Sequence, residues 1–431
     1  MLTAMPRLNV KIGPLPLYAI DFLIFMTFVH AQKIRPLFHG KRPFEGLVTL
    51  ILMFAVLGEL GAVIYSGKMI QPVYILVRTF LAFSLFYSVS RIVQTRADIL
   101  AVVKVATLGV IITASLMILT SLPFTRSLVI STIFSISYLE PAAEEMLHSA
   151  YTRLYYAGVG LRGHSLVGVS ILSGAFLNTM WPLVALLFRW PGQIRIWKTL
   201  ALAGTLLAPL GVVMSYSRGA ILGMLMVVGG VLFFGSSRSR QGIIVAALVT
   251  ASIFSVFGWD SDLFVFQRVE ERTIAVFENP YEDERETERL YAYTEPFEHV
   301  LDNPQFLVMG EGVSIGKTGV RSEQQGRARH AVFAKAYYAY GMVAAFLYAV
   351  LVIKGFSYTR MQIKMRRRTE GIAALYSQAL FASLLGMLPW FAFGHAAISQ
   401  PRGAMLFFLL FGLVASLKNF PVAPPRCKQR G

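Results

Sequence analysis

Three residues of this 431-residue chain combine a reactive side chain with a position at the edge of an apolar segment: Arg218, Arg289 and His330. Arg218 lies in the turn Ser-Tyr-Ser-Arg-Gly-Ala between two apolar runs, where a guanidinium is costly and normally has a partner or a ligand. Its planar fork suits a phosphate or a carboxylate. The structural alternative is an arginine that reaches lipid headgroups or pairs with a loop carboxylate such as Glu270 or Glu288.

His330 stands at the start of an apolar run and follows a basic stretch that includes Arg321, Arg327 and Arg329. Because nearby cations favour the neutral form of imidazole, a histidine here can serve as a general base near neutral pH. The three arginines suit a diphosphate or acidic sugars. The alternative for His330 is a polar residue that simply begins a helix.

Arg289 belongs to a densely charged stretch and lies one helical turn after Arg285. Such a stretch is also typical of a solvated helix face whose charges pair with one another. Further on, Gly310-Glu-Gly312 and Gly316 would allow close approach to a phosphate, but no strand precedes them and no Walker lysine-serine pair follows. The glycines therefore do not predict a nucleotide-binding loop.

Two short acidic patterns raise the question of a metal ion. Asp260 and Asp262 form a DxD pair, while Glu144, Glu145 and His148 lie within about one helical turn of one another. Hard cations need more oxygen ligands than either run supplies. The sequence therefore predicts no metal and no cofactor, and the DxD pair remains the alternative to test.

The elements that must position these residues are membrane helices, since 55% of the side chains are apolar and 15% are charged. The net charge is +17, and the Lys and Arg residues lie mostly in short gaps between apolar runs instead of in one patch. This distribution indicates membrane topology and predicts no nucleic-acid partner. The single cysteine, Cys427, excludes an internal disulfide framework. We interpret Met1–Pro16 as a retained N-terminus.

Apolar runs of about 20 residues predict about eleven membrane spans in an all-α integral membrane protein. These spans are Leu15–His30, Phe44–Ser66, Ile70–Ile92, Ile99–Leu122, His164–Phe188, Trp197–Ser215, Ala220–Phe234, Gly242–Gly258, Ala331–Lys354, Ile372–Gly394 and Gly403–Leu417. Leu128–Leu139 is short for a span, so we interpret it as interfacial or re-entrant; as a span it would be the twelfth. The predicted domains are N-terminal helices (1–258), one large periplasmic loop containing short helices (259–330), and C-terminal helices with a basic tail (331–431).

Basic residues in short loops mark the cytoplasmic side. They place Gly235–Gln241 and Gly355–Glu370 inside, so the loop Trp259–His330 between them must lie outside. One span earlier, the turn that contains Arg218 falls on the same outer face. The three candidate residues therefore share one side of the membrane.

Three motifs resemble the O-antigen ligase and O-antigen polymerase family of bacterial envelope enzymes. Met214–Ile221 is similar to the family's serine-arginine-glycine-alanine turn, and His330 with Gly341 reproduces a His-x10-Gly spacing. Between them, Arg289 is followed by an aromatic-rich stretch, Asn-Pro and Gly-x-Gly. The family usually has asparagine after the histidine, whereas this chain has Ala331, which concerns the acceptor side of the site.

The resemblance implies transfer of a glycan from an undecaprenyl-diphosphate carrier to an acceptor hydroxyl at the periplasmic face of the inner membrane. Arg218 and Arg289 would bind the diphosphate and His330 would take the acceptor proton. We expect a surface-polysaccharide polymerase, with a ligase that uses a lipid A core acceptor as the alternative. A lipid-linked glycan transporter, which would need mid-depth charges such as Glu59 and Arg78, and a non-catalytic scaffold are alternatives of other classes.

Overall fold

The computed structural model describes residues 9–34, 42–129, 163–235, 294–314, 332–366, 371–393 and 401–420, apart from a few positions within these ranges, together with positions 132, 240, 241 and 244. The helices of the bundle are α1 (Ala19–Ile34), α2 (Glu45–Ser66), α3 (Ile70–Ile92), α4 (Arg96–Ser121), α9 (Ser170–Leu187), α10 (Arg195–Val213), α11 (Arg218–Phe234), α17 (Met342–Arg366), α18 (Ile372–Phe393) and α20 (Pro401–Ser416). Shorter elements are β1 (Asn9–Ile12), β2 (Leu15–Tyr18), α5 (Pro123–Val129), α16 (Val332–Tyr340), and the 3-10 turns η2 (Pro304–Leu307) and η5 (Leu417–Asn419).

Helices long and apolar enough to cross a membrane dominate the described part of the chain. Eight described segments meet that condition, α11 is a shorter apolar helix, and α1 has 16 residues. A helix therefore occupies ten of the predicted spans, and of the remaining one, Gly242–Gly258, the structure describes only Ile244. The expectation of an all-α integral membrane protein is confirmed.

The N-terminal boundary differs from the prediction. Leu15–Tyr18 pairs with Asn9–Ile12 in a small antiparallel hairpin, so the first helix begins at Ala19 instead of Leu15. Part of the stretch that we interpreted as interfacial, Leu128–Leu139, is also described: its first two residues end α5, which starts with Pro123 directly after α4.

The largest departure concerns the predicted span Ala331–Lys354, which is not one helix. The chain breaks at Gly341, whose φ of 93° favours glycine, between the short α16 and the long α17. A Cβ at Gly341 would lie 2.8 Å from the carbonyl carbon of Val308, so the break is also a point of close packing. Because α17 continues to Arg366, most of the cytoplasmic loop predicted at Gly355–Glu370 is helix.

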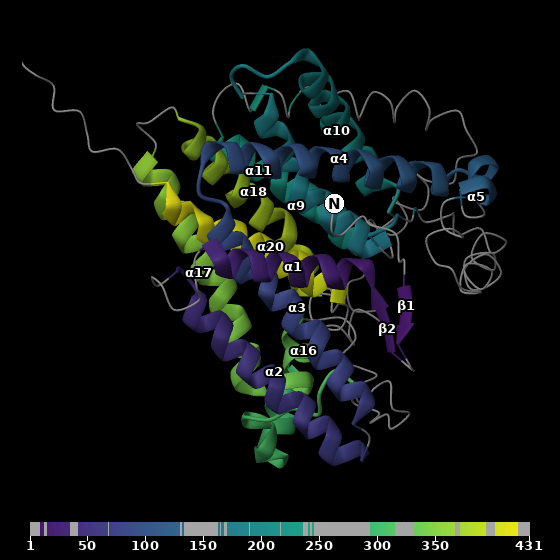
Figure 1. Cartoon of the computed structure of the whole chain (residues 1–431), viewed down its shortest axis with the longest axis vertical. Helices are drawn as coiled ribbons and strands as arrows, with labels where there is room; N and C mark the ends of the chain where they lie inside the picture. The colour runs from purple at the N-terminus through teal and green to yellow at the C-terminus, as the bar shows by residue number, and fades with distance from the viewer. Residues whose placement is uncertain are drawn as a thin grey trace, which may run out of the picture.

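The helix α9 is at the centre of one half of the bundle, where it packs against α4, α10, α11 and α18. The helix α20 lies along α3, and α2 packs against α3, α16 and α17. In Figure 1, α3 and α20 run through the middle of the bundle. The helices α4 and α10 lie on one side of them, and α2 and α16 lie on the other. Residues far apart in the sequence therefore share a continuous apolar core.

Glycines bring α9, α11 and α18 into close contact. A Cβ at Gly223 of α11 would lie 2.5 Å from the carbonyl oxygen of Gly386 and 2.6 Å from the side-chain nitrogen of Asn178. That same Asn178 nitrogen donates a hydrogen bond of 2.7 Å to the carbonyl oxygen of Ala220. Small residues and a polar cross-link are the usual means by which helices associate in lipid. They fix the first turn of α11 relative to α9.

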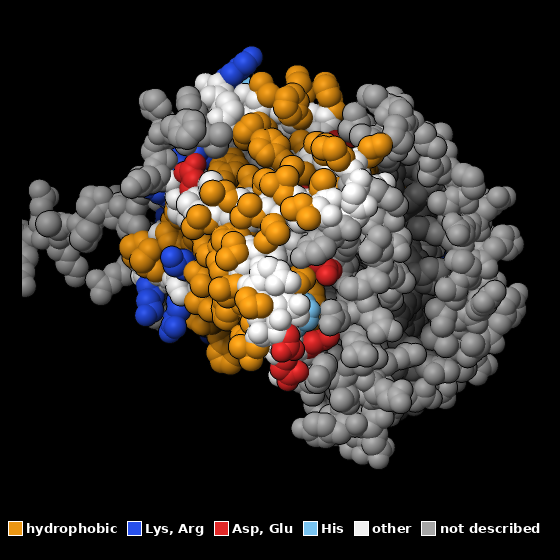
Figure 2. All heavy atoms as spheres, turned by 90° about the horizontal axis from the view of Figure 1, so that it is seen from below, with side chains coloured by type: hydrophobic (Ala, Val, Ile, Leu, Met, Phe, Trp, Pro, Cys, Tyr) orange, Lys and Arg blue, Asp and Glu red, His pale blue; other side chains and the backbone are white. Residues whose placement is uncertain are grey.

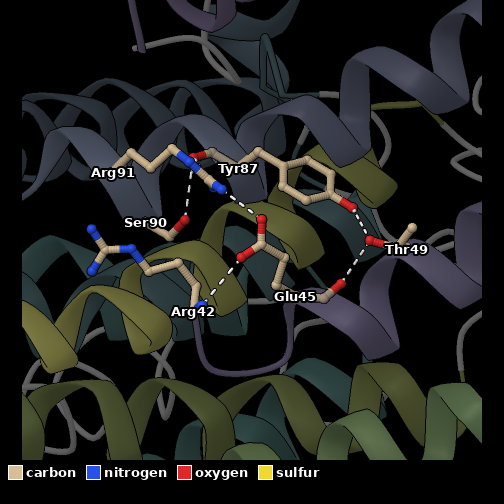
Figure 3. A network of polar contacts seen from close by, with 6 residues as sticks. All are labelled: Arg42, Glu45, Thr49, Tyr87, Ser90 and Arg91. Atoms are coloured by element: carbon tan, nitrogen blue, oxygen red, sulfur yellow. Dashed lines mark hydrogen bonds and ion pairs between the residues drawn. The ribbon is translucent and has the colours of Figure 1, made fainter. Parts of the chain in front are cut away.

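A network around Arg91 holds the end of the bundle that lies opposite the first turn of α11 (Figure 3). We call this end of the bundle the Arg91 end. The Arg91 guanidinium lies 2.5 Å from the Glu45 carboxylate and donates to the Tyr87 carbonyl oxygen at 3.2 Å. The other Glu45 oxygen accepts from the Arg42 backbone N–H, and the Tyr87 and Thr49 hydroxyls are 2.8 Å apart. Since Arg91 is buried, this pairing is needed to offset its desolvation.

Large apolar side chains cover the outside of the bundle. Figure 2 shows one face on which hydrophobic side chains predominate, with Lys and Arg at one edge and Asp, Glu and a histidine near the other. Exposed apolar side chains occur on all the outer helices, for example Phe22 and Phe25 of α1, Met53 and Ile64 of α2, Leu225 and Phe233 of α11, and Ile353 of α17. In a membrane protein this is the lipid-facing surface.

We expect Gly223→Ala to lower the thermal stability of the purified protein, because its Cβ would push α11 away from Asn178 and α18. Overpacking of this kind costs about 1 to 3 kcal/mol. The matched control is Gly229→Ala on the same helix, where nothing lies within 4 Å of an added Cβ. The measurement is the temperature at which each variant in detergent loses its monodisperse elution peak. Equal losses in both variants would contradict the packing argument.

Candidate functional site

Successive spans alternate in direction. One side of the bundle therefore contains the last residues of α2, α4 and α10 and the first residues of α3, α11 and α17. We call this the Arg218 end. Two clusters of described residues occur there. One surrounds the turn before α11, and the other lies where the segment 294–314 meets α2 and α16.

Serine hydroxyls shape the turn that leads to Arg218, the first residue of α11. The buried Ser215 hydroxyl donates to the carbonyl oxygen of Val212 at 2.6 Å and accepts from the backbone N–H of Ser217 at 3.2 Å. Ser217 is the N-cap, and its hydroxyl accepts from the backbone N–H of Ala220 at 3.4 Å. The Ser-x-Ser-Arg sequence thus ends one helix and starts the next within three residues.

The position of Arg218 places two sources of positive potential together. The N-terminus of a helix carries the positive end of its dipole and presents backbone N–H groups. Arg218, a residue of intermediate exposure, belongs to that same first turn. This arrangement favours an anion such as a phosphate or diphosphate, and the fork geometry allows two parallel hydrogen bonds to it.

A second arginine is connected to the same turn. The backbone N–H of Gly163 donates to the carbonyl oxygen of Met214 at 2.8 Å. Three residues later, the carbonyl oxygen of Leu166 accepts a hydrogen bond from Arg402, near the start of α20. The sequence analysis missed Arg402, because the predicted span began at the next residue. The available signal was an arginine directly before a span whose start falls on the predicted outer side.

A buried carboxylate joins α2 to the glycine-rich segment. Glu59, only 2% exposed, accepts hydrogen bonds from the backbone N–H of Val313 and from the Ser314 hydroxyl, both at 2.7 Å. Gly312 has a φ of 78°, and a Cβ there would lie 2.7 Å from the Ala62 side chain. The bend at Gly312 therefore lets the chain approach α2 closely enough to satisfy Glu59.

The same segment also pairs with the end of α16. The backbone N–H of Glu311 donates to the carbonyl oxygen of Tyr338 at 2.8 Å, and that of Gly312 donates to Ala339 at 3.0 Å. These carbonyls belong to the last turn of α16, where the carbonyl oxygens of a helix have no hydrogen-bond donor within the helix. The Gly-Glu-Gly segment thus caps α16 and packs it on α2.

A histidine that the sequence analysis did not select packs against α16. His299 belongs to a helical stretch at residues 294–302, and its Nδ1 atom shares a hydrogen bond of 2.7 Å with the Tyr337 hydroxyl. Burial, together with Glu311 and Glu295, raises the pKa of Tyr337 above its usual range. Burial and Glu295 do the same to the pKa of Tyr338. Both phenols are therefore protonated at neutral pH.

Of the predicted site residues, Arg218 is the one that the structure describes. The others, Arg289, His330, Arg321, Arg327 and Arg329, lie outside the described residues. So do both acidic patterns considered for a metal, Asp260 with Asp262 and Glu144 with Glu145 and His148. Within the described part of the chain, no group of three or more His, Cys, Asp or Glu side chains is placed to hold a metal ion.

The fold and this site define a multi-pass helical membrane protein with an arginine at the start of a helix, Arg218, at one end of its bundle. A family model described as O-antigen ligase matches residues 201–349, about a third of the chain. The match runs from α10 through the Arg218 turn and α16 into α17, and it confirms the resemblance to the O-antigen ligase and polymerase family. A comparison with curated proteins finds no match. The family match supports a glycosyltransferase-type enzyme of the membrane.

We expect Glu59→Leu to release the 310–314 segment from α2, because its two hydrogen bonds to a charged acceptor are lost. Each such bond contributes about 1.5 to 3 kcal/mol. Hydrogen–deuterium exchange of a peptide spanning 305–314 should become faster. Glu59→Gln, which keeps one carbonyl acceptor, should have a smaller effect.

The control for this experiment is Met53→Ala, also on α2 but at an exposed, lipid-facing position. Exchange in this variant should equal that of the unaltered protein. Unchanged exchange in Glu59→Leu would show that the segment is held by other contacts.

Proposed function

We propose that this protein is a membrane glycosyltransferase that transfers a glycan from an undecaprenyl-diphosphate carrier to an acceptor hydroxyl at the periplasmic face. We favour a surface-polysaccharide polymerase. The observation that carries the proposal is the position of Arg218, at the positive N-terminus of α11 and within the matched region. A diphosphate is the part of the donor that such a site suits.

The distribution of basic residues supports an orientation in which the Arg218 end faces the periplasm and the Arg91 end the cytoplasm. Basic residues gather where helices end or begin on the Arg91 side, namely Lys33, Arg91, Arg96, Arg195, Lys198, Arg360, Lys364, Arg366 and Lys418. An excess of Lys and Arg is characteristic of cytoplasmic loops. The inner membrane of a bacterium is therefore the proposed location, with the apolar helix faces in contact with its lipids.

The proposed reaction needs an anion-stabilising group and a proton acceptor. The acceptor oxygen forms a bond to the anomeric carbon, the bond from that carbon to the carrier phosphate breaks, and the lipid diphosphate leaves with the electron pair. Arg218 and Arg289 would stabilise the charge that develops on the diphosphate, which is larger in the transition state than in the bound donor. His330 would accept the proton of the acceptor hydroxyl. Arg321, Arg327 and Arg329 would bind the anionic donor or acidic sugars.

The acceptor distinguishes two versions of this proposal. A polymerase would use a second lipid-linked repeat unit, so that donor and acceptor share one chemistry. A ligase would use lipid A core. The matching family is described as O-antigen ligase, and the match applies to both versions. Neither version needs a nucleotide or a nucleic acid.

We expect Arg218→Ala to lower product formation by at least about a hundredfold, because removal of one donor to a developing anion typically costs this much. Arg218→Lys should retain part of the activity, since it keeps the charge but loses the planar fork. The matched control is Arg195→Ala, which also removes an arginine at the first position of an apolar helix, at the other end of the bundle. Similar losses from Arg195→Ala and Arg218→Ala would count against a role in catalysis.

A second experiment separates the two acceptors. The purified protein is supplied with an undecaprenyl-diphosphate oligosaccharide, with and without lipid A core, and with EDTA in a parallel reaction. A ladder of long chains from the donor alone is the expected result for a polymerase. Product that requires lipid A core would establish the ligase instead, and loss with EDTA would point to a metal at Asp260 and Asp262. No product under any of these conditions would refute the proposal.

A further inference from the structure

The helical stretch 294–302, at the Arg218 end, has one buried side and one exposed side. The buried side packs against α16 and the core: His299 shares a hydrogen bond with the Tyr337 hydroxyl, and Val300 lies against the apolar core. These contacts fix the rotation of the helix about its own axis. The direction in which its exposed side chains point is therefore also fixed.

The exposed side is divided along the helix into an apolar edge and an acidic edge. Phe297 and Leu301 are one turn apart, and these residues are 46% and 80% exposed. Glu298 and Asp302 are also exposed, and each follows one of the apolar residues by one position, which is about 100° around the helix. This division on the outside of a helix is typical of one that lies in the plane of a membrane interface.

Two more exposed apolar residues follow in the same segment. Leu307 is 49% exposed and Val308 is 48% exposed. Val308 packs against Gly341, where α16 ends and α17 begins, so these side chains lie beside the start of a membrane span. Large apolar side chains that gather on a surface in this way normally mark a contact with lipid or with another protein.

The apolar edge is continuous with the lipid-facing surface of α17. The Phe297 ring stacks on that of Phe333, with 5.8 Å between the ring centres, and its centre lies 6.2 Å from that of Phe346. Phe346 is 49% exposed. Val350 and Ile353 follow it on the same face of α17 and are exposed as well. Lipid that covers this face of the span would therefore also meet Phe297, which selects lipid over another protein.

The contact between the two rings also indicates a depth. Phe346 lies four residues after Met342, the first residue of α17, which is about 6 Å along the helix axis. Phe297 thus meets α17 on the membrane side of its first turn. Interfacial helices bury their apolar side by about 5 to 10 Å at the boundary between headgroups and acyl chains. The contact has the depth that such a helix requires.

We propose that residues 294–308 form an interfacial segment, whose apolar edge lies among the acyl chains of the leaflet at the Arg218 end. The carboxylates of Glu298 and Asp302 face the water. Part of the stretch predicted as a periplasmic loop, 259–330, then lies in the membrane surface. This inference goes beyond the proposed function and does not require it. If the transferase proposal also holds, the segment lies at the depth of the donor's diphosphate.

A fluorescent label tests what surrounds the apolar edge. The chain has a single cysteine, Cys427, so Cys427→Ser provides a background in which one new cysteine can be labelled. In this background, Leu301→Cys is labelled with the environment-sensitive fluorophore NBD, and the full-length protein is reconstituted into phosphatidylcholine nanodiscs. We expect a blue-shifted emission that is quenched by lipids with a doxyl group near the top of the acyl chain. Iodide in the water should not quench it.

The matched control is Asp302→Cys, the next residue along, on the acidic edge. Its label should emit at longer wavelength and be quenched by iodide but not by doxyl lipids. Ile353→Cys, on the exposed face of α17, is the reference for a deeper position. It should be quenched most by a doxyl group near the end of the acyl chain. Leu307→Cys should behave as Leu301→Cys does, and it provides a second variant if Leu301→Cys does not fold.

Two results would overturn the inference. Equal quenching of the Leu301 and Asp302 labels by iodide would show that the apolar edge faces water. A blue-shifted emission from the Leu301 label that neither quencher reduces would show that protein, and not lipid, covers this edge. Neither measurement uses a donor or an acceptor, so a failure of this inference is distinguishable from a failure of the proposed transferase.

Discussion

The carboxylate of Glu59 is the group on which the arrangement of the Arg218 end depends. A buried carboxylate in an apolar bundle must receive hydrogen bonds, and Glu59 receives them from Val313 and Ser314, more than 250 residues away in the sequence. The glycine segment that reaches it also caps the last turn of α16. Since α16 carries Tyr337, whose hydroxyl shares a hydrogen bond with His299, the helical stretch 294–302 is also placed through this contact.

The two ends of the bundle use charge for different purposes. At the Arg91 end, Arg91 is paired with Glu45, and the buried Arg366 donates to Ser377 and to the carbonyl oxygen of Leu417. These contacts tie α17, α18 and the end of α20 together, so their charges serve the fold. At the Arg218 end, the turn before α11 is already held by serine hydroxyls and by Asn178. The shape of that turn is thus set by uncharged groups, and the role proposed for Arg218 there is to bind the diphosphate.

The sequence was sufficient for most of the helices because each is an apolar run of membrane length. It failed at Gly341, since no change of hydropathy marks a break that is imposed by close packing on Val308. It also ended α17 too early, because the basic residues after Gly355 resemble a loop, whereas buried Arg366 has partners on α18 and after α20. The polar pairings were beyond prediction for a related reason: nothing local in the sequence connects Glu59 to Ser314, or His299 to Tyr337.

The placement of the charged residues within the spans favours an enzyme over a transporter. A transport pathway would need ionisable groups that face a path and change partners as it opens. The two candidates engage neighbouring elements: Glu59 holds the glycine segment, and Arg78 lies 3.4 Å from Asp21 and over the ring of Tyr74. The contact of α9 with α11 and α18 leaves no room for a Cβ at Gly223 or Gly386, so these helices form a closely packed unit. Such a scaffold suits the proposed enzyme, in which a rigid bundle would hold a lipid-linked donor at one face of the membrane.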